Sequence, residues 1–123
     1  MATLNIMVEE AQGNVPVTVM HLQGDIDAGT HATLTAKAEE LVGGGAGHIL
    51  LDLSGVGYMG SAGFRALHAI SNMLETEGGT GMGKSRRLKL LSPTEDVSRV
   101  IKTLGFDVYL DTYENQEEAV QSF

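Results

Sequence analysis

The chain has 123 residues and a mass of 13.0 kDa, the size of one domain, which excludes a two-domain enzyme or a barrel of eight βα units. The absence of cysteine excludes disulfide scaffolds, zinc–thiolate sites and cysteine nucleophiles. Sixteen acidic residues against eight basic ones give a net charge of −8, which disfavours nucleic-acid binding. No apolar run approaches the ~20 residues needed to cross a bilayer, and the N-terminus, with Glu9 and Glu10, lacks a secretory-signal pattern. We expect a soluble, cytoplasmic protein.

The first half of the chain predicts a β-hairpin followed by a helix. Apolar residues alternate with polar ones over Leu4–Val8, a turn signal follows at Gln12–Asn14, and Val15–Leu22 is rich in β-branched residues, with a proline tolerated near its start. Thr30 is a candidate cap for a helix with apolar residues at helical spacing, which ends at Gly43–Gly45.

The second half predicts strands that alternate with helices. The strands are expected at His48–Leu53, Leu88–Leu91 and, at the sheet edge, Phe106–Leu110. The helices are expected from a Ser61 cap to Leu74, at Thr94–Leu104 with Gly105 as its stop, and at Glu114–Phe123. This order, β-β-α-β-α-β-α-(β)-α, indicates a single α/β domain over residues 1–123 with mainly parallel pairing after the hairpin. A glycine-rich insertion lies at about residues 77–83.

Two segments resemble phosphate or nucleic-acid sites but lack the required context. Gly78–Ser85 matches the P-loop pattern, yet a helix precedes it and a strand follows, the reverse of the order that phosphate binding needs. We interpret it as a flexible connection. The nearby basic cluster is short, lacks interleaved aromatic residues and is interpreted as a solvated strand entrance; it comprises Lys84, Arg86, Arg87 and Lys89.

Acidic and histidine residues provide no clear catalytic or metal site. Asp25 and Asp27 follow a strand, as in phosphatases with a D-x-D-x-T pattern, but Thr30 is one residue out of place. The favoured interpretation is that these acids satisfy backbone amides at a strand-to-helix turn. No ligand spacing connects the histidines, so no metal or cofactor is expected; they are His21, His31, His48 and His68.

The most informative segment is Leu50–Leu67, in which a strand leads through a loop of small residues to a helix. The free amides and the positive dipole end of that helix suit an anion or the acidic side chain of a partner. An ordinary capped helix is the alternative.

This segment resembles the signature of STAS domains, the family of sulfate-transporter C-terminal domains and bacterial anti-sigma factor antagonists. Leu51–Leu67 is similar to the family block L-D-L-x-x-[VL]-x-[FY]-[MI]-D-S-[ST]-G. Leu22–Asp27, Leu88–Asp107 and the tail at Glu117–Ala119 resemble three further family segments in the right order. The resemblance implies a STAS-like mixed sheet of about four to five strands with helices mainly on one face. It also implies a non-enzymatic protein-interaction function in transcriptional signalling.

The resemblance further implies a partner, a kinase-type anti-sigma factor that phosphorylates a hydroxyl in the D-S-[ST]-G loop. The chain departs from that pattern twice, because Gly60 replaces the aspartate and Ala62 replaces the phosphorylated residue. Ser61 is then the remaining phosphorylation candidate. The predicted partner-binding residues are Asp27, Met59, Gly60, Ser61, Ala62, Gly63 and Phe64. The alternative is a self-associating scaffold, for instance a homodimer, or a sensor of a small ligand such as a nucleotide or anion.

Overall fold

The computed structural model describes residues 3–75 and 87–123. Its five strands are β1 (Asn5–Gln12), β2 (Pro16–Gln23), β3 (Ile49–Gly55), β4 (Leu88–Leu91) and β5 (Thr112–Tyr113). Its helices are α1 (His31–Gly43), α2 (Ser61–Leu74), α3 (Glu95–Thr103), the 3-10 helix η1 (Phe106–Val108) and α4 (Gln116–Gln121). The expected glycine-rich insertion and the P-loop-like segment lie outside the described residues.

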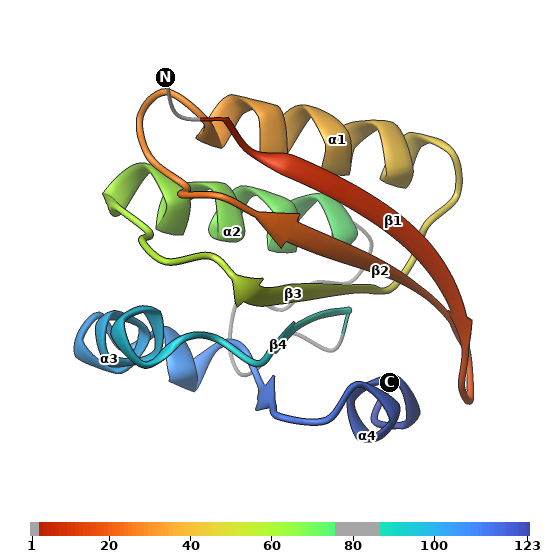
Figure 1. Ribbon diagram of the computed structural model, residues 1–123. Coiled ribbons are helices and arrows are strands. Elements are labelled where there is room, and N and C mark those ends of the chain that lie inside the picture. Colours follow the sequence, from red (N-terminus) through yellow and green to blue (C-terminus); the bar gives the residue numbers. More distant parts are fainter. Residues whose placement is uncertain (1–2, 76–86) are drawn as a thin grey trace.

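The strands form one mixed sheet in the order β1-β2-β3-β4-β5 (Figure 1). β1 is antiparallel to β2, as expected for a hairpin, whereas each of the later pairs is parallel. Parallel pairing requires a crossover between strands, and α1, α2 and α3 provide these connections. The predicted α/β class, single sheet and element order are confirmed.

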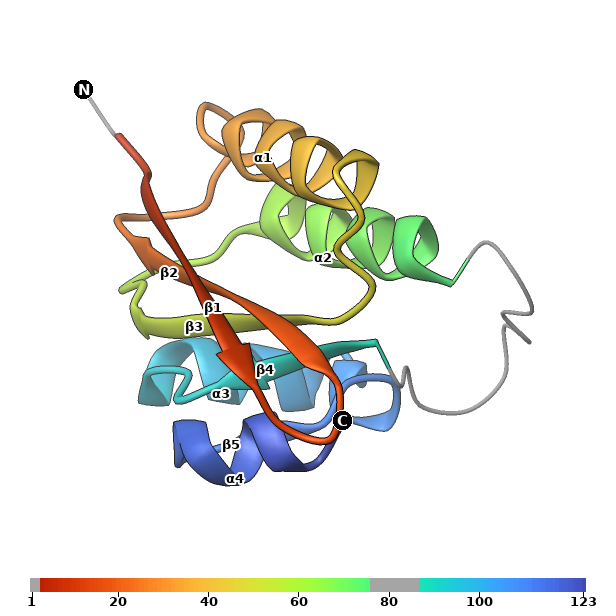
Figure 2. The same cartoon turned by 90° about the vertical axis from the view of Figure 1, so that its right-hand side faces the viewer.

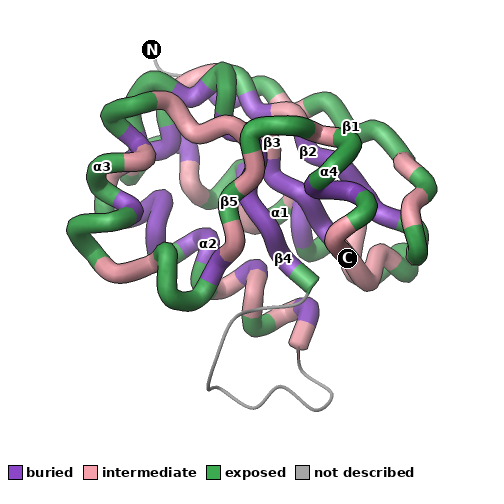
Figure 3. Tube along the Cα trace, turned by 90° about the horizontal axis from the view of Figure 1, so that it is seen from below, coloured by how far each residue is buried: buried purple, intermediate pink, exposed green. Residues whose placement is uncertain are grey.

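The sheet separates two apolar clusters of unequal size. The larger one joins the sheet to α1, α2 and α3 through residues such as Met20, Leu51 and Leu67. The smaller one lies under α4 and includes Val19, Leu50 and Val120. Because β3 is covered on both faces, its first three residues are fully buried, which explains their continuous apolar run. Figures 2 and 3 show this arrangement, with the buried central strands between the outer helices.

The predicted edge strand at Phe106–Leu110 is wrong. Gly105 has a left-handed φ of 78° and ends α3 as expected, but the chain then turns into η1, where the Val108 amide donates to the Gly105 carbonyl. The Phe106 ring packs on Phe64 with 5.3 Å between ring centroids. Pairing with β4 begins only at Thr112, so tertiary packing displaces the edge strand toward the C-terminus.

Lys89 is also not the solvated residue that the sequence predicts. Its side chain is buried beneath the C-terminal residues, and its Nζ donates to the carbonyl and hydroxyl oxygens of Ser122 at 2.9 and 3.0 Å. The ammonium group also lies 4.9 Å from the centre of the Phe123 ring and 5.6 Å from that of Tyr113. These contacts replace part of its hydration by carbonyl, hydroxyl and aromatic groups.

Replacement of Leu67 by alanine tests the larger cluster. Leu67 is fully buried, so Leu67→Ala should reduce the free energy of unfolding by about 2–5 kcal/mol, through lost burial and the cavity left behind. Leu104→Ala is the matched control, because Leu104 is 52% exposed and should lose much less. Chemical denaturation of both variants would measure the difference. Equal losses would contradict the described core.

Candidate functional site at the carboxyl edge of the sheet

The loops after β2, β3 and β4 meet at the carboxyl edge of the parallel strands. Ile26 and Met59 form an isolated parallel bridge, in which the Ile26 amide donates to the Tyr58 carbonyl and the Gly60 amide donates to the Ile26 carbonyl. The Thr94 hydroxyl donates to the Val56 carbonyl at 3.1 Å and connects the loop after β4. Ligands and partners of α/β sheets commonly bind at this edge, because its loops converge there.

Asp27 forms hydrogen bonds in the turn that precedes α1. Its Oδ1 accepts hydrogen bonds from the Gly29 and Thr30 amides, while the Asp27 amide donates to the Thr30 hydroxyl, which itself donates to the Asp25 carbonyl at 2.7 Å. Thr30 occupies the cap position of α1, as predicted, but its side chain makes no cap hydrogen bond to the helix. The Asp27 carboxylate instead satisfies amides of the turn that precedes the helix. The interpretation of Asp27 as an acid that satisfies turn amides is confirmed.

A glycine, and not a residue with a capping side chain, precedes the first turn of α2. Gly60 occupies the cap position and its carbonyl accepts from the amides of Gly63 and Phe64, with no side-chain cap. Ser61 was expected to cap this helix but is its first residue. The Gly60 backbone already has the extended conformation of a cap residue, so the cap precedes the serine.

Gly63 allows α2 to approach the bridge closely. A Cβ atom at this position would lie 2.5 Å from Met59 Cγ, 2.9 Å from Ile26 Cγ2 and 3.2 Å from the Ile26 carbonyl oxygen. A side chain therefore cannot fit without displacing Ile26 and Met59. Glycine at this position sets the distance between the helix and the loops that surround it.

The predicted partner-binding residues are brought together, but they differ in exposure. Ser61 is exposed, and Asp27 and Gly60 are half-buried. The other four are buried in the packing of α2 against the loops: Met59, Ala62, Gly63 and Phe64. These four buried residues fix the positions of the loops and of the start of α2. The accessible surface at this edge is formed by the exposed residues next to them.

Those neighbours include side chains that the sequence analysis did not single out. Tyr58 is 57% exposed, and its hydroxyl lies 3.1 Å from where a Cβ on Gly60 would be. Arg65 is also exposed, as is Asp25, which the sequence analysis considered only as a candidate catalytic acid. Arg65 falls outside the apolar stripe of α2, and this helical position was the signal that could have identified it.

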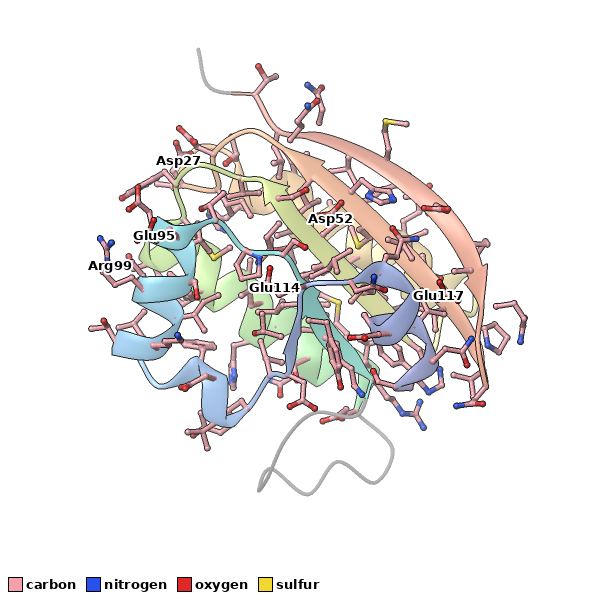
Figure 4. All side chains as sticks on the ribbon, turned by 60° about the horizontal axis from the view of Figure 1, so that its bottom comes forward. Asp27, Asp52, Glu95, Arg99, Glu114 and Glu117 are labelled. Carbon is pink, nitrogen blue, oxygen red and sulfur yellow. The ribbon has the colours of Figure 1, made fainter. Side chains whose placement is uncertain are left out.

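Acidic residues from two connections lie at this end of the molecule. Figure 4 labels Asp27, from the loop after β2, and Glu95, at the start of α3, on the same side of the view. Glu95 and Asp96 occupy the first turn of α3, where the helix dipole favours them, and both pair with Arg99 at 3.6 and 3.5 Å. These exposed pairs contribute little to stability. Within residues 3–75 and 87–123, no group of three histidine, aspartate or glutamate side chains could hold a metal ion.

The comparison with protein families identifies the class of protein that has this fold and edge. The STAS domain family model matches residues 5–119, so the chain belongs to the STAS domain family. No curated protein matches the chain. In the described part of the chain, no helix is long and apolar enough to cross a membrane.

Solved structures with this fold include anti-sigma factor antagonists. The chain is similar to an anti-sigma factor antagonist from Mycobacterium paratuberculosis, with 24% identity, a TM-score of 0.79, and coverage of 97% of this chain and 92% of that one. It is also similar to unphosphorylated SpoIIAA, with 22% identity, a TM-score of 0.73 and coverage of 94% and 93%. Phosphorylated SpoIIAA from Bacillus is similar as well, with 21% identity, a TM-score of 0.66, and coverage of 94% of this chain and 96% of that one. At these identities the likeness establishes the fold.

Replacement of Gly63 by alanine tests the close packing of α2. The new methyl group would collide with Ile26 and Met59, so Gly63→Ala should lower the free energy of unfolding by about 1–3 kcal/mol despite the better helix propensity of alanine. Gly43→Ala, at the end of α1 where nothing lies within 4 Å, is the control and should be neutral or stabilising. Thermal and chemical denaturation would compare them. A Gly63→Ala protein as stable as the Gly43→Ala protein would argue against this packing.

Proposed function

We propose that this STAS domain binds a kinase-type anti-sigma factor or a related regulator in the cytoplasm and thereby controls transcription. The observation that carries the proposal is the convergence of the loops after β2 and β3 on the start of α2, within a chain that matches the family model almost end to end. The similarity to solved anti-sigma factor antagonists supports it. The domain acts by binding, without a reaction of its own.

The proposed contact surface consists of the exposed side chains around the loop after β3. Tyr58 offers a large aromatic group at the surface, and such groups are frequent anchors of protein interfaces. Ser61 follows as the first residue of α2, and Asp25 and Asp27 contribute carboxylates from the neighbouring loop. With a chain charge of −8, this surface suits a partner with a basic face, whose association is accelerated by electrostatic attraction.

Phosphorylation cannot regulate this surface through residue 62 in the usual way. Ala62 lacks a hydroxyl group, so no phosphate ester can form there. Ser61 is exposed and is the adjacent hydroxyl. We propose that binding is either constitutive or controlled through a different signal, with Ser61 as the position to examine for phosphate.

Self-association is the second candidate function. Three large exposed apolar side chains of the described residues lie close together in sequence, after α3 and in or beside η1: Leu104, Val108 and Tyr109. Exposed apolar groups in such proximity are typical of interaction surfaces. Sedimentation of the purified chain would separate the candidates, because a stable dimer without a captured regulator would favour the scaffold function.

The first experiment is affinity capture from a lysate of the source cells, with ATP and separately with ADP, followed by mass spectrometry. Recovery of a kinase-like anti-sigma factor is expected, and its dependence on nucleotide would reveal how binding is controlled. Recovery of only the chain itself would contradict the proposed function and favour self-association.

Truncation of Tyr58 tests the proposed surface with the captured partner. Tyr58→Ala should weaken binding at least tenfold, or about 1.4 kcal/mol, if this ring is an interface anchor. Tyr109→Ala is the control, because Tyr109 is a similarly exposed tyrosine, at 54%, that lies next to η1 and contacts the Phe106 ring. Titration calorimetry would measure both affinities. Binding that survives Tyr58→Ala but not Tyr109→Ala would move the interface to η1.

Restoration of the hydroxyl tests the missing switch. Incubated with the captured kinase and ATP, the Ala62→Ser protein should gain a phosphate that the wild type does not take at this position, and the added charge should weaken the complex. The double variant Gly60→Asp, Ala62→Ser tests whether the aspartate is also needed. The side chain introduced by Gly60→Asp requires the exposed Tyr58 ring to shift. Phosphopeptide mapping would locate the phosphate, and wild-type modification at Ser61 would show that regulation had moved by one residue.

A further inference from the structure

His21 on β2 lies between two carboxylates from the strands on either side. Its Nδ1 is 2.6 Å from Asp52 Oδ2 on β3, and its Nε2 is 2.7 Å from Glu9 Oε1 on β1. An ionised carboxylate only accepts hydrogen bonds, so both ring nitrogens must carry a proton for both contacts to be favourable. The neutral ring has one N–H, and its second nitrogen would direct a lone pair at a carboxylate oxygen. The geometry therefore specifies the imidazolium form.

The electrostatic environment acts in the same direction. The hydrogen bond to Glu9, followed by the one to Asp52, raises the pKa of His21 above its ordinary value of 6.5, although partial burial opposes this. Burial by itself would raise the pKa of Asp52, but hydrogen bonds from Ser54 and His21 bring it below its usual value. The hydrogen bond from His21 likewise lowers the pKa of Glu9. The two carboxylates are thus ionised wherever the histidine titrates.

The cluster adds side-chain contacts between β1, β2, β3 and α4 to the backbone pairing of β1 with β2. β1 is an edge strand whose residues are mostly exposed. Glu9 Oε1 also accepts from Gln116 Nε2, at 3.4 Å, in the first turn of α4. The Ser54 amide and hydroxyl hold the other oxygen of Asp52 at 3.0 and 2.7 Å. The charged groups that contact the ring are Glu9 from β1 and Asp52 from β3, while α4 contributes the uncharged amide of Gln116.

The two carboxylates contact different nitrogens on opposite sides of one ring, so they cannot bind a metal ion together. The group that can bind or leave this cluster is the second proton of the His21 ring. We propose that protonation of His21 controls how firmly β1 and the first turn of α4 are held against the centre of the sheet, so that this face loosens when the proton leaves. The stabilisation is fully present below the unfolded-state pKa near 6.5 and is lost as the pH rises through the higher folded-state value. Alkaline conditions therefore favour the looser state.

Nuclear magnetic resonance of the full chain tests this proposal in two measurements. The ¹⁵N shifts of the His21 ring should report a doubly protonated imidazolium whose pH midpoint lies above 6.5. Amide hydrogen exchange, corrected for its intrinsic pH dependence, should show that β1 loses protection several-fold as the pH passes that midpoint. The β3 amides should keep theirs, because they lie between two paired strands.

Three variants separate the cluster from a general effect of pH. Glu9→Gln should lower the His21 midpoint, whereas Glu10→Gln should not, because Glu10 is the next residue on β1 and bonds to Thr18 instead. His21→Gln should abolish the pH step in β1 protection. A wild-type midpoint at or below 6.5, or β1 protection that is constant across the midpoint, would overturn the proposal. Both of these tests use the wild-type protein, so they remain decisive even if a variant fails to fold.

Discussion

The candidate site depends on the contact between Gly63 and the bridge that pairs Ile26 with Met59. Because no side chain separates α2 from this bridge, the helix starts directly on the loops that follow β2 and β3. The same backbone contacts place Asp27 and Gly60 on either side of Ile26. A surface of two loops and a helix start is thus positioned by main-chain geometry, and it needs no reactive side chain to exist.

Local patterns in the sequence predicted most of the fold. The main error arose where contacts between residues far apart in the sequence determine the local structure. The hairpin, the alternation of strands and helices and the stop at Gly105 follow from periodicity and from residues next to one another in the chain. The structure at Phe106–Leu110 could not be predicted this way, because the Phe106 ring packs against Phe64, which lies more than forty residues earlier in the chain. The assignment of Ser61 as a cap failed for a smaller reason: a serine near a helix start does not show which residue has the extended cap conformation.

The predicted partner-binding residues lie together in the structure, but their burial was not predicted. The resemblance selected the segment around Ser61, and the structure does bring Asp27 to it. It could not show that Met59, Ala62 and Phe64 face inward, since a family motif marks residues that shape a surface as well as residues that contact a partner. Tyr58 and Arg65 project outward there because the inward positions are already taken by the packing of α2.

The environment of Lys89 makes the last residues of the chain part of the folded domain. Its buried ammonium group has Ser122 as its described hydrogen-bond acceptor and Phe123 as the nearer of its two aromatic neighbours. Removal of these two residues would take away both acceptors and the nearer aromatic ring, and would open the ammonium group to water. The residues that follow α4 therefore contribute to the cover of β4 as well as to the helix that they end.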